Sequence, residues 1–329
     1  MTIHLISFAS ILHKQVPLRS SHEAILSELE KYYTVKIVDY QHIDTLRPED
    51  FKIIFIATGG VEKLVIQQFE RLPRPAVLLA DGQQNSLAAA LEIATWLRVR
   101  GLKSEVLHGE LSAIIQRIHI LCSNFRAQRS LYGKRIGVIG ADYIDLPLER
   151  IYEKYQHITD EQVGASCATV ASQALACREG TPEDILKAMK LYRALKQVAE
   201  EERLDALTLS CFKLIDKLDT TGCLALSLLN DDGIVAGCEG DLQSVFTLLA
   251  VKAITGKESF MANPSSLQSR NNELVLAHCT IGLKQTEHYI IRNHFETARG
   301  IAIQGLLPLG DVTLIKCGGE CLDEYYLST

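Results

Sequence analysis

The sequence of 329 residues contains few charged and few aromatic side chains, which make up 22% and 6% of it. No apolar run reaches the roughly 20 residues that a membrane helix needs, so we expect no membrane association. The formal net charge of −6 comes from interspersed residues, and no basic cluster favours nucleic acid as a partner. With 47% hydrophobic residues, the composition is typical of a soluble globular protein with a sizeable core.

Cysteine pairs at metal-binding or redox spacing are also missing. The nine cysteines include no CxxC motif and lie scattered, mostly in apolar stretches, so we interpret them as reduced core residues. The first residues, MTIHLISFAS, predict a strand and lack the basic segment and apolar core of a signal peptide. We therefore expect a cytoplasmic protein.

Residues 1–131 alternate short apolar strands with helices, which predicts an α/β domain with a parallel sheet. Serine and glutamate at 20–23 resemble a capping box that opens a first helix. The expected strands are 3–9, 35–40, 53–57, 76–80 and 105–108, and further helices are expected at 61–72, 87–100 and 111–131.

Polar residues follow three of these strands, with Thr58, Asn85 and His108 as the candidates for substrate binding. The carboxyl edge of an open parallel sheet is where ligands bind, and a polyol needs a cluster of groups that bind hydroxyls. Loops between strands and helices are rich in such residues in any case, so a purely structural role stays open.

Residues 132–256 predict a second α/β domain, and residues 257–329 predict a third. In the second, Gly137 and Gly140 form GVIG, which lacks the GxGxxG spacing of a nicotinamide-binding turn and disfavours a dehydrogenase. The third changes to period two and predicts a small antiparallel β sheet or barrel, marginal alone at roughly 70 residues. Strands are expected at 136–139, 207–211, 274–279, 289–293, 301–306 and 312–317, and a capped helix at 182–203.

The second domain contains the leading site candidate. A buried strand at 234–238 ends in Glu239-Gly240-Asp241, and apolar residues with helical spacing follow up to Gly256. Two carboxylates at the carboxyl end of a buried strand lie where α/β sheets place ligand-binding groups. The structural alternative is that Asp241 only caps the helix and Glu239 only favours its dipole.

The run GCLALSLLNDDGIVAGCEGDLQSVFTLL at 222–249 resembles the carboxyl-terminal half of the L-fucose isomerase and L-arabinose isomerase superfamily. It is most similar to the shorter, fucose-isomerase-like members, and NSLAAALE at 85–92, ELVLAHCT at 273–280 and HFETARG at 294–300 extend the likeness. The resemblance implies an aldose–ketose isomerase that acts through an enediol on a small sugar or an acidic sugar derivative. It also implies a homo-oligomer, a trimer or a hexamer.

In the enzymes that this chain resembles, Mn²⁺ or another divalent metal is bound by two acidic side chains and a histidine. Matching the motifs gives Glu239 as one acidic ligand, with Asp241 as the alternative, and His278 as the nearby histidine. Lys213 falls where the other acidic ligand is expected, and a protonated lysine repels a cation. The metal site is then weakened, or replaced by a Lys213–Glu239 ion pair in which the lysine polarises the carbonyl or acts as a base.

His294 and Arg299 lie in a polar stretch between two expected strands. They line a sugar or anion pocket in one interpretation and a solvated turn in the other. Arg292 and Lys316 are interpreted as surface residues. A non-catalytic sugar-binding or regulatory relative of the isomerases stays open beside the enzyme, because a fold does not carry its function with it.

Overall fold

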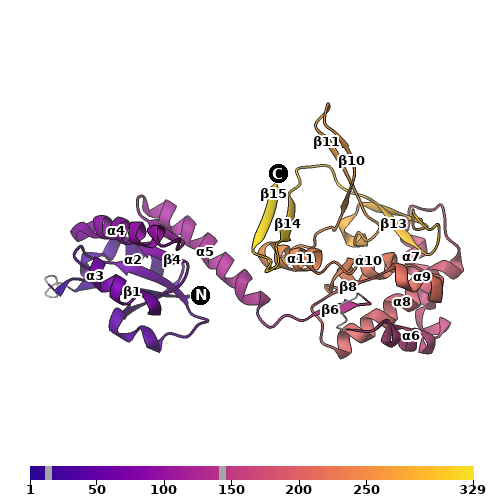
Figure 1. Cartoon of the computed structure of the whole chain (residues 1–329), viewed down its shortest axis with the longest axis horizontal. Coiled ribbons are helices and arrows are strands. Elements are labelled where there is room, and N and C mark those ends of the chain that lie inside the picture. The colour runs from indigo at the N-terminus through magenta and orange to yellow at the C-terminus, as the bar shows by residue number, and fades with distance from the viewer. Residues whose placement is uncertain (12–16, 141–145) are drawn as a thin grey trace. The chain divides into compact units, whose positions relative to one another are not determined.

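The computed structural model describes residues 1–11, 17–140 and 146–329 and confirms the predicted α/β class. The chain forms two compact units, Met1–Arg129 and Ser130–Thr329, which Figure 1 shows in indigo to magenta and in magenta to yellow. Within the described residues, no helix is long and apolar enough to cross a membrane.

The first unit is built on a five-stranded parallel sheet with the strand order β2-β1-β3-β4-β5. From β1, the chain adds β2 on one side of the sheet and β3 to β5 on the other, so the strand order reverses between β1 and β3. Doubly wound sheets bind ligands at such a position. The elements are β1 Thr2–Phe8, α1 Leu18–Ser21, α2 Glu23–Glu30, β2 Thr34–Asp39, β3 Phe51–Ile56, α3 Glu62–Gln67, β4 Ala76–Leu79, α4 Ser86–Val99, β5 Ser104–Leu107 and α5 Leu111–Leu131, with 3-10 turns η2 Tyr40–Thr45, η3 Phe69–Arg71 and η4 Gln83–Asn85.

Helices cover both faces of this sheet because the central strands are apolar on both sides. The buried residues of α2 and α5 pack on one face, and those of α3 and α4 pack on the other. The expected capping box does not form: α2 begins after His22 without a side-chain cap. Ser20 and Ser21 are themselves the end of the short helix α1, so neither is placed to cap α2.

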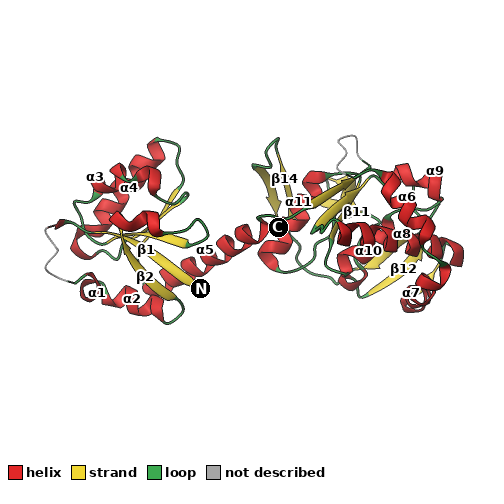
Figure 2. Ribbon diagram, turned by 90° about the horizontal axis from the view of Figure 1, so that it is seen from below, coloured by secondary structure: helices red, strands yellow, loops and turns green. Residues whose placement is uncertain are grey.

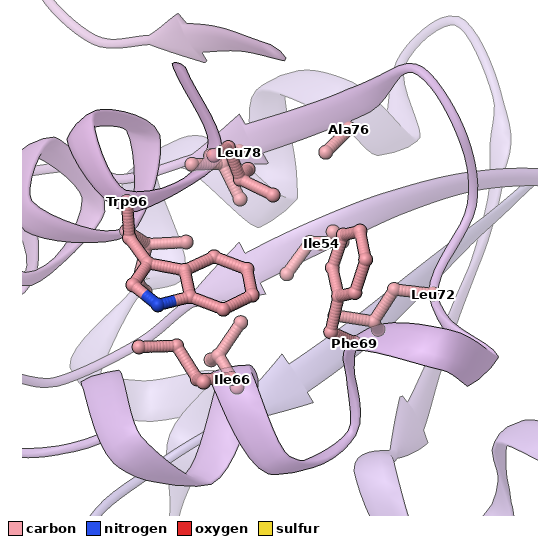
Figure 3. Close-up of a pocket in the computed structure, with 10 residues that line it drawn as sticks. Ile54, Ile66, Phe69, Leu72, Ala76, Leu78 and Trp96 are labelled. Carbon is pink, nitrogen blue, oxygen red and sulfur yellow. The ribbon is translucent and has the colours of Figure 1, made fainter. Parts of the chain in front are cut away.

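An apolar cavity of about 10 Å³ lies between the sheet and the α3–α4 layer. Figure 3 shows Trp96 and Phe69 facing Ile54 and Leu78 across it. A volume of this size is no larger than one water molecule requires, and its lining offers little for a water to bind. We therefore assign it to packing and not to a sugar.

The second unit contains a three-stranded parallel sheet with the order β6-β8-β9. Helix α8 packs against α6, α7 and α10 on one side, while α11 packs against β8 and β9. The elements are β6 Ile136–Ile139, α6 Leu148–His157, α7 Asp160–Gln173, β7 Ala176–Cys177, α8 Pro182–Glu201, β8 Ala206–Leu209, α9 Phe212–Leu218, α10 Cys223–Asp231, β9 Val235–Cys238, α11 Leu242–Thr255, β10 Asn263–Gln268, β11 Glu273–Ala277, η5 Leu283–Gln285, β12 His288–Arg292, β13 Ala302–Leu306, β14 Leu314–Gly318 and β15 Glu324–Ser328.

Two local features hold strand β9 in place. Gly237 lets α11 approach closely, since a Cβ there would lie 2.4 Å from Val245 Cγ2. Asn230, at the end of α10, donates from Nδ2 to the carbonyl of Ala236 (2.8 Å) and accepts from the Ala236 N–H (2.9 Å). Strand β9 is therefore held by a helix on one face and by a buried amide at its middle.

The C-terminal strands form several small sheets and not the single antiparallel sheet or barrel that the sequence predicts. Strands β10–β11 and β14–β15 are separate hairpins, and β12 pairs with β13 on one side and with β7 on the other. Figure 1 shows the β10–β11 hairpin projecting from the second unit, and Figure 2 shows β11 and β14 in a second view. The division of this unit into domains 132–256 and 257–329 stays a prediction.

Candidate functional site

The turn after β9 has an unusual backbone. Glu239 has a φ of +68° and Gly240 a φ of +69°, so both lie in the left-handed region. For a residue with a side chain, this conformation costs on the order of 1 kcal/mol or more, and such positions gather at functional sites. Asp241 then caps α11, because its Oδ1 accepts from the Ser244 N–H at 2.8 Å.

Glu239 and His278 meet at this turn, as the sequence predicts. His278 Nε2 lies 3.6 Å from Glu239 Oε1, and the side chains are 6% and 44% exposed. Asn263 Nδ2 donates to the same oxygen of Glu239 at 2.8 Å. The carboxylate is thus held from one side and remains open to solvent on the other.

The tautomer of His278 follows from its neighbours. Its Nδ1 accepts the Cys279 N–H at 3.0 Å, so the proton of the neutral ring is on Nε2 and faces Glu239. Burial lowers the pKa of His278, and the nearby Glu239 carboxylate raises it by less. The net pKa lies below its usual value, which leaves the ring neutral at pH 7.

Asp241 faces a different partner. Its Oδ2 accepts from Lys316 Nζ at 2.8 Å and from Ser244 Oγ at 2.6 Å. Burial raises the pKa of Asp241, but the bonds from Lys316 and Ser244 outweigh it and hold the pKa below its usual value. Both oxygens are occupied, and Lys316 is a partner of this carboxylate and not the plain surface residue that the sequence suggests.

The predicted Lys213–Glu239 ion pair is not found among the described residues. Lys213 lies in the first turn of α9, and its Nζ donates to the Gly140 carbonyl at 2.7 Å. Gly140 follows β6, and β8 separates β6 from β9 in the sheet. Lys213 therefore points to the edge of the sheet opposite to the strand that carries Glu239.

His294 approaches the site, whereas Arg299 contacts a different partner. His294 is 8% exposed, and a positive charge on it would lower the pKa of His278. Its Nδ1 lies 3.2 Å from Thr297 Oγ1. Arg299 is exposed, and its Nη1 lies 3.9 Å from a carboxylate oxygen of Asp219.

Four buried thiols lie beside these residues, and we did not predict their meeting from the sequence. Cys211 Sγ and Cys238 Sγ are 2.9 Å apart, and the Cys223 and Cys279 thiols interact with each other. The hydrogen bond with Cys279 lowers the pKa of Cys223, while the same bond and burial raise the pKa of Cys279. Sequence separations of 27 residues for the first pair and of about twice that for the second give no short motif to detect.

The first unit gathers a second polar group at the carboxyl edge of its sheet. Thr58 Oγ1 accepts the Ser10 N–H at 2.8 Å between β1 and β3. A Cβ at Gly59 would lie 3.1 Å from Asn85 Nδ2, and one at Gly82 would lie 3.0 Å from His108 Cε1. Thr58, Asn85 and His108 thus follow neighbouring strands as expected, and their role in binding stays a prediction.

A buried hydrogen bond between a histidine and an aspartate at this edge was missed. His22 Nδ1 lies 2.6 Å from Asp81 Oδ2, with side chains 1% and 12% exposed. Burial raises the pKa of Asp81, but the hydrogen bonds from His22 and the Gln83 N–H together outweigh burial, so the net pKa is below its usual value. The sequence signal was the position of Asp81 at a strand end, but nothing indicated that His22, directly before α2, would reach it.

The predicted trio of Glu239, Asp241 and His278 does not fit a divalent metal well. Among the described residues, the three possible ligand atoms that do lie together belong to Cys223, Cys279 and His294. These atoms are all within 4.8 Å of one another. Asp241 cannot turn to an ion without losing Lys316 and the cap of α11. The predicted metal ligands are therefore reduced to the Glu239–His278 pair.

No family model matches the chain. It is similar to several curated proteins named sulfoquinovose isomerase. The one from Clostridium sp. (strain MSTE9) is 27% identical over 153 residues, 46% of this chain and 34% of that protein. The one from Alkalicoccus urumqiensis is 21% identical over 192 residues, 56% and 43% of the two chains, and the one from Priestia megaterium (strain ATCC 12872 / QMB1551) is 23% identical over 145 residues, 41% and 31%. The chain thus spans less than half of the length of these relatives.

Proposed function

We propose that this chain is a carbohydrate isomerase that interconverts an aldose and a ketose, acting on a small sugar or an acidic sugar derivative. The observation that carries the proposal is the 3.6 Å approach of Glu239 and His278 at a strained strand end. The names of the relatives supply the substrate class, since sulfoquinovose is a sugar that bears an acidic group. Membership of the L-fucose and L-arabinose isomerase superfamily is part of the same proposal.

The reaction moves one proton between adjacent carbons through an enediol. A base removes the proton from C2, the electron pair forms the C1–C2 double bond, and the carbonyl oxygen at C1 takes up a proton. Returning a proton to C1 while the hydroxyl oxygen at C2 loses one completes the change. The site therefore needs one group that exchanges protons with carbon and another that serves the two oxygens.

Glu239 fits the first role and His278 the second. The Glu239 carboxylate is 44% exposed, accepts a hydrogen bond from Asn263 and lies 3.6 Å from His278 Nε2, and its exposed side gives a ligand access to it. His278 is neutral, with Nε2–H directed at the same opening and Nδ1 held by the Cys279 N–H. A neutral imidazole can donate a hydrogen bond to a sugar oxygen and take a proton back.

We route no step through a divalent metal at Glu239, Asp241 and His278, because the Asp241 carboxylate is engaged by Lys316 and Ser244. Lys213 enters no step either, since it lies on the β6 side of the sheet. Both differences from the pattern of the resembling enzymes favour one second candidate, a sugar-binding relative without turnover.

A screen of aldoses and ketoses separates the two candidates. Purified protein is incubated with neutral, uronate and sulfonate forms of hexoses, and interconversion is measured together with binding by calorimetry. We expect turnover that Glu239→Gln abolishes and that Glu273→Gln, at an exposed carboxylate on β11, leaves unchanged. Binding without turnover of any sugar would select the non-catalytic candidate, and neither binding nor turnover would reject both.

A further inference from the structure

Cys223, Cys279 and His294 form a cluster whose two thiol sulfurs and one ring nitrogen lie within 4.8 Å of one another. The three residues are 1%, 6% and 8% exposed. They come from three separate segments: Cys223 begins α10, Cys279 follows β11 and His294 follows β12. Folding therefore builds this cluster, and local sequence does not.

The surroundings hold the cluster in place. His294 has its Nδ1 3.2 Å from Thr297 Oγ1, which orients the ring and directs Nε2 away from that hydroxyl. The ring of Phe212 packs edge-on against His294, with centroids 5.8 Å apart. Gly222, directly before Cys223, leaves room for a neighbouring thiol, since a Cβ there would lie 2.8 Å from Cys211 Sγ.

We propose that Cys223, Cys279 and His294 bind one Zn²⁺ ion as its three protein ligands. Two sulfurs and an imidazole nitrogen form a donor set that suits zinc, whereas Mn²⁺ and Mg²⁺ favour oxygen. Zinc bonds of about 2.3 Å to sulfur and about 2.0 Å to nitrogen place tetrahedral ligand atoms roughly 3.5–3.8 Å apart. Atoms that lie within 4.8 Å of one another need to close by at most about 1.3 Å to reach that geometry.

The site has a second observation in its favour: Thr297 engages Nδ1 of His294, so the ligand atom that we propose is Nε2. Histidines that bind metal through one ring nitrogen almost always use the other in a hydrogen bond that fixes the tautomer and the ring orientation. Thr297 supplies that bond here. The proposal uses neither Glu239 nor a sugar, so it stands apart from the proposed isomerase activity.

Cobalt provides the direct test, because Co²⁺ enters zinc sites and its thiolate bonds absorb in the near ultraviolet. The background carries Cys177→Ser and Cys321→Ser, which remove the exposed cysteines as accidental ligands. Under reducing conditions, we expect one Co²⁺ per chain with a thiolate charge-transfer band, and we expect Zn²⁺ but not Mn²⁺ to displace it.

Variants then assign the ligands. Cys223→Ser and Cys279→Ser each should weaken Zn²⁺ binding by more than about 100-fold, and Thr297→Ala should weaken it by about 10–100-fold, as loss of an outer hydrogen bond does. Cys122→Ser, at a buried thiol of α5 in the first unit, is the matched control and should leave the band unchanged. A charge-transfer band that survives the combined loss of Cys223 and Cys279 would overturn the assignment.

X-ray absorption of the zinc-loaded parent decides the question where a variant fails to fold. We expect two sulfur neighbours at about 2.3 Å and a nitrogen at about 2.0 Å. A first shell of oxygen and nitrogen alone, or zinc content that stays near zero after loading, contradicts the proposal. Sugar turnover has no bearing on these readouts, so failure of the zinc site and failure of the isomerase are distinguishable.

Discussion

Replacing Asn230 by alanine should strongly destabilise the second unit. The buried amide makes three hydrogen bonds. Its Nδ2 donates to the carbonyls of Leu226 (3.0 Å) and Ala236 (2.8 Å), and its Oδ1 accepts from the Ala236 N–H (2.9 Å). Each such bond contributes about 0.5–1.5 kcal/mol, and a buried group left without a partner costs about 1–3 kcal/mol. We therefore expect a loss of roughly 2–4 kcal/mol in the free energy of unfolding.

The loss should appear as a lower urea midpoint in far-ultraviolet circular dichroism, with an unchanged dependence on denaturant. The single tryptophan of the chain, Trp96, lies in the first unit and gives an internal reference. Its fluorescence transition should stay in place, because the hydrogen bonds that Asn230 makes lie within the second unit. Asn271→Ala, at an exposed residue of the β10–β11 turn, is the control and should cost less than about 0.5 kcal/mol.

A loss below about 1 kcal/mol in Asn230→Ala would refute this reasoning, because a single intact hydrogen bond already contributes that much. It would mean that Asn230 does not tie α10 to β9. The end of β9 that carries Glu239 would then need another support.

Three further predictions concern protonation, metal and assembly. Burial holds the pKa of His278 and of His294 below the reference value of 6.5, so the unfolded chain binds more protons than the folded chain just below that pH. The free energy of unfolding should therefore fall as the pH drops from 7 to 5. His278→Asn should reduce the slope of this dependence. Lys213→Glu should leave Mn²⁺ affinity unchanged in calorimetry, since Lys213 lies on Gly140 and not on Glu239; a tighter complex would restore the placement expected from the sequence. Light scattering at micromolar concentration should give a homo-oligomer, because the C-terminal segment exposes large apolar residues such as Leu309 and Tyr325; a clean monomer would contradict this.

The parallel strands and their helices could be predicted from the sequence because their apolar pattern is local. The helix at 111–131 and the strand at 136–139 have the expected bounds. Buried strands of a parallel sheet appear in the sequence as continuous apolar runs. A capping residue marks the start of a helix, as Thr181 does for α8. These signals need no knowledge of the remaining chain.

The C-terminal arrangement could not be predicted in the same way. Strand β7 has only two residues, Ala176–Cys177, and pairs with β12 far along the chain. Such a strand has no measurable period, and its pairing depends on where α7 ends. Period two at 274–317 indicated strands, but it carried no information on which strands share a sheet.

For the candidate site, the sequence predicted the contact between two residues that a motif placed at strand ends. It was wrong where the contact depended on the direction in which a side chain points. Glu239 and His278 follow β9 and β11 and meet as predicted. Lys213 was placed by counting along the chain, but its position on α9 directs it to β6. The cluster of Cys223, Cys279 and His294 was not predicted, because no short spacing links the three. The sequence indicated core residues for the two cysteines, and a pocket or a solvated turn for His294.

Deuterium incorporation tests the central claim most directly. An isomerase that works through an enediol with Glu239 as the base exchanges the migrating proton with solvent, so the reaction is run in D₂O with the best sugar from the screen. The account predicts deuterium at C1 or C2 of the product, lost in Glu239→Gln and retained in Glu273→Gln. Conversion by Glu239→Gln at the native rate, with the same label, would contradict the account and remove Glu239 from the chemistry.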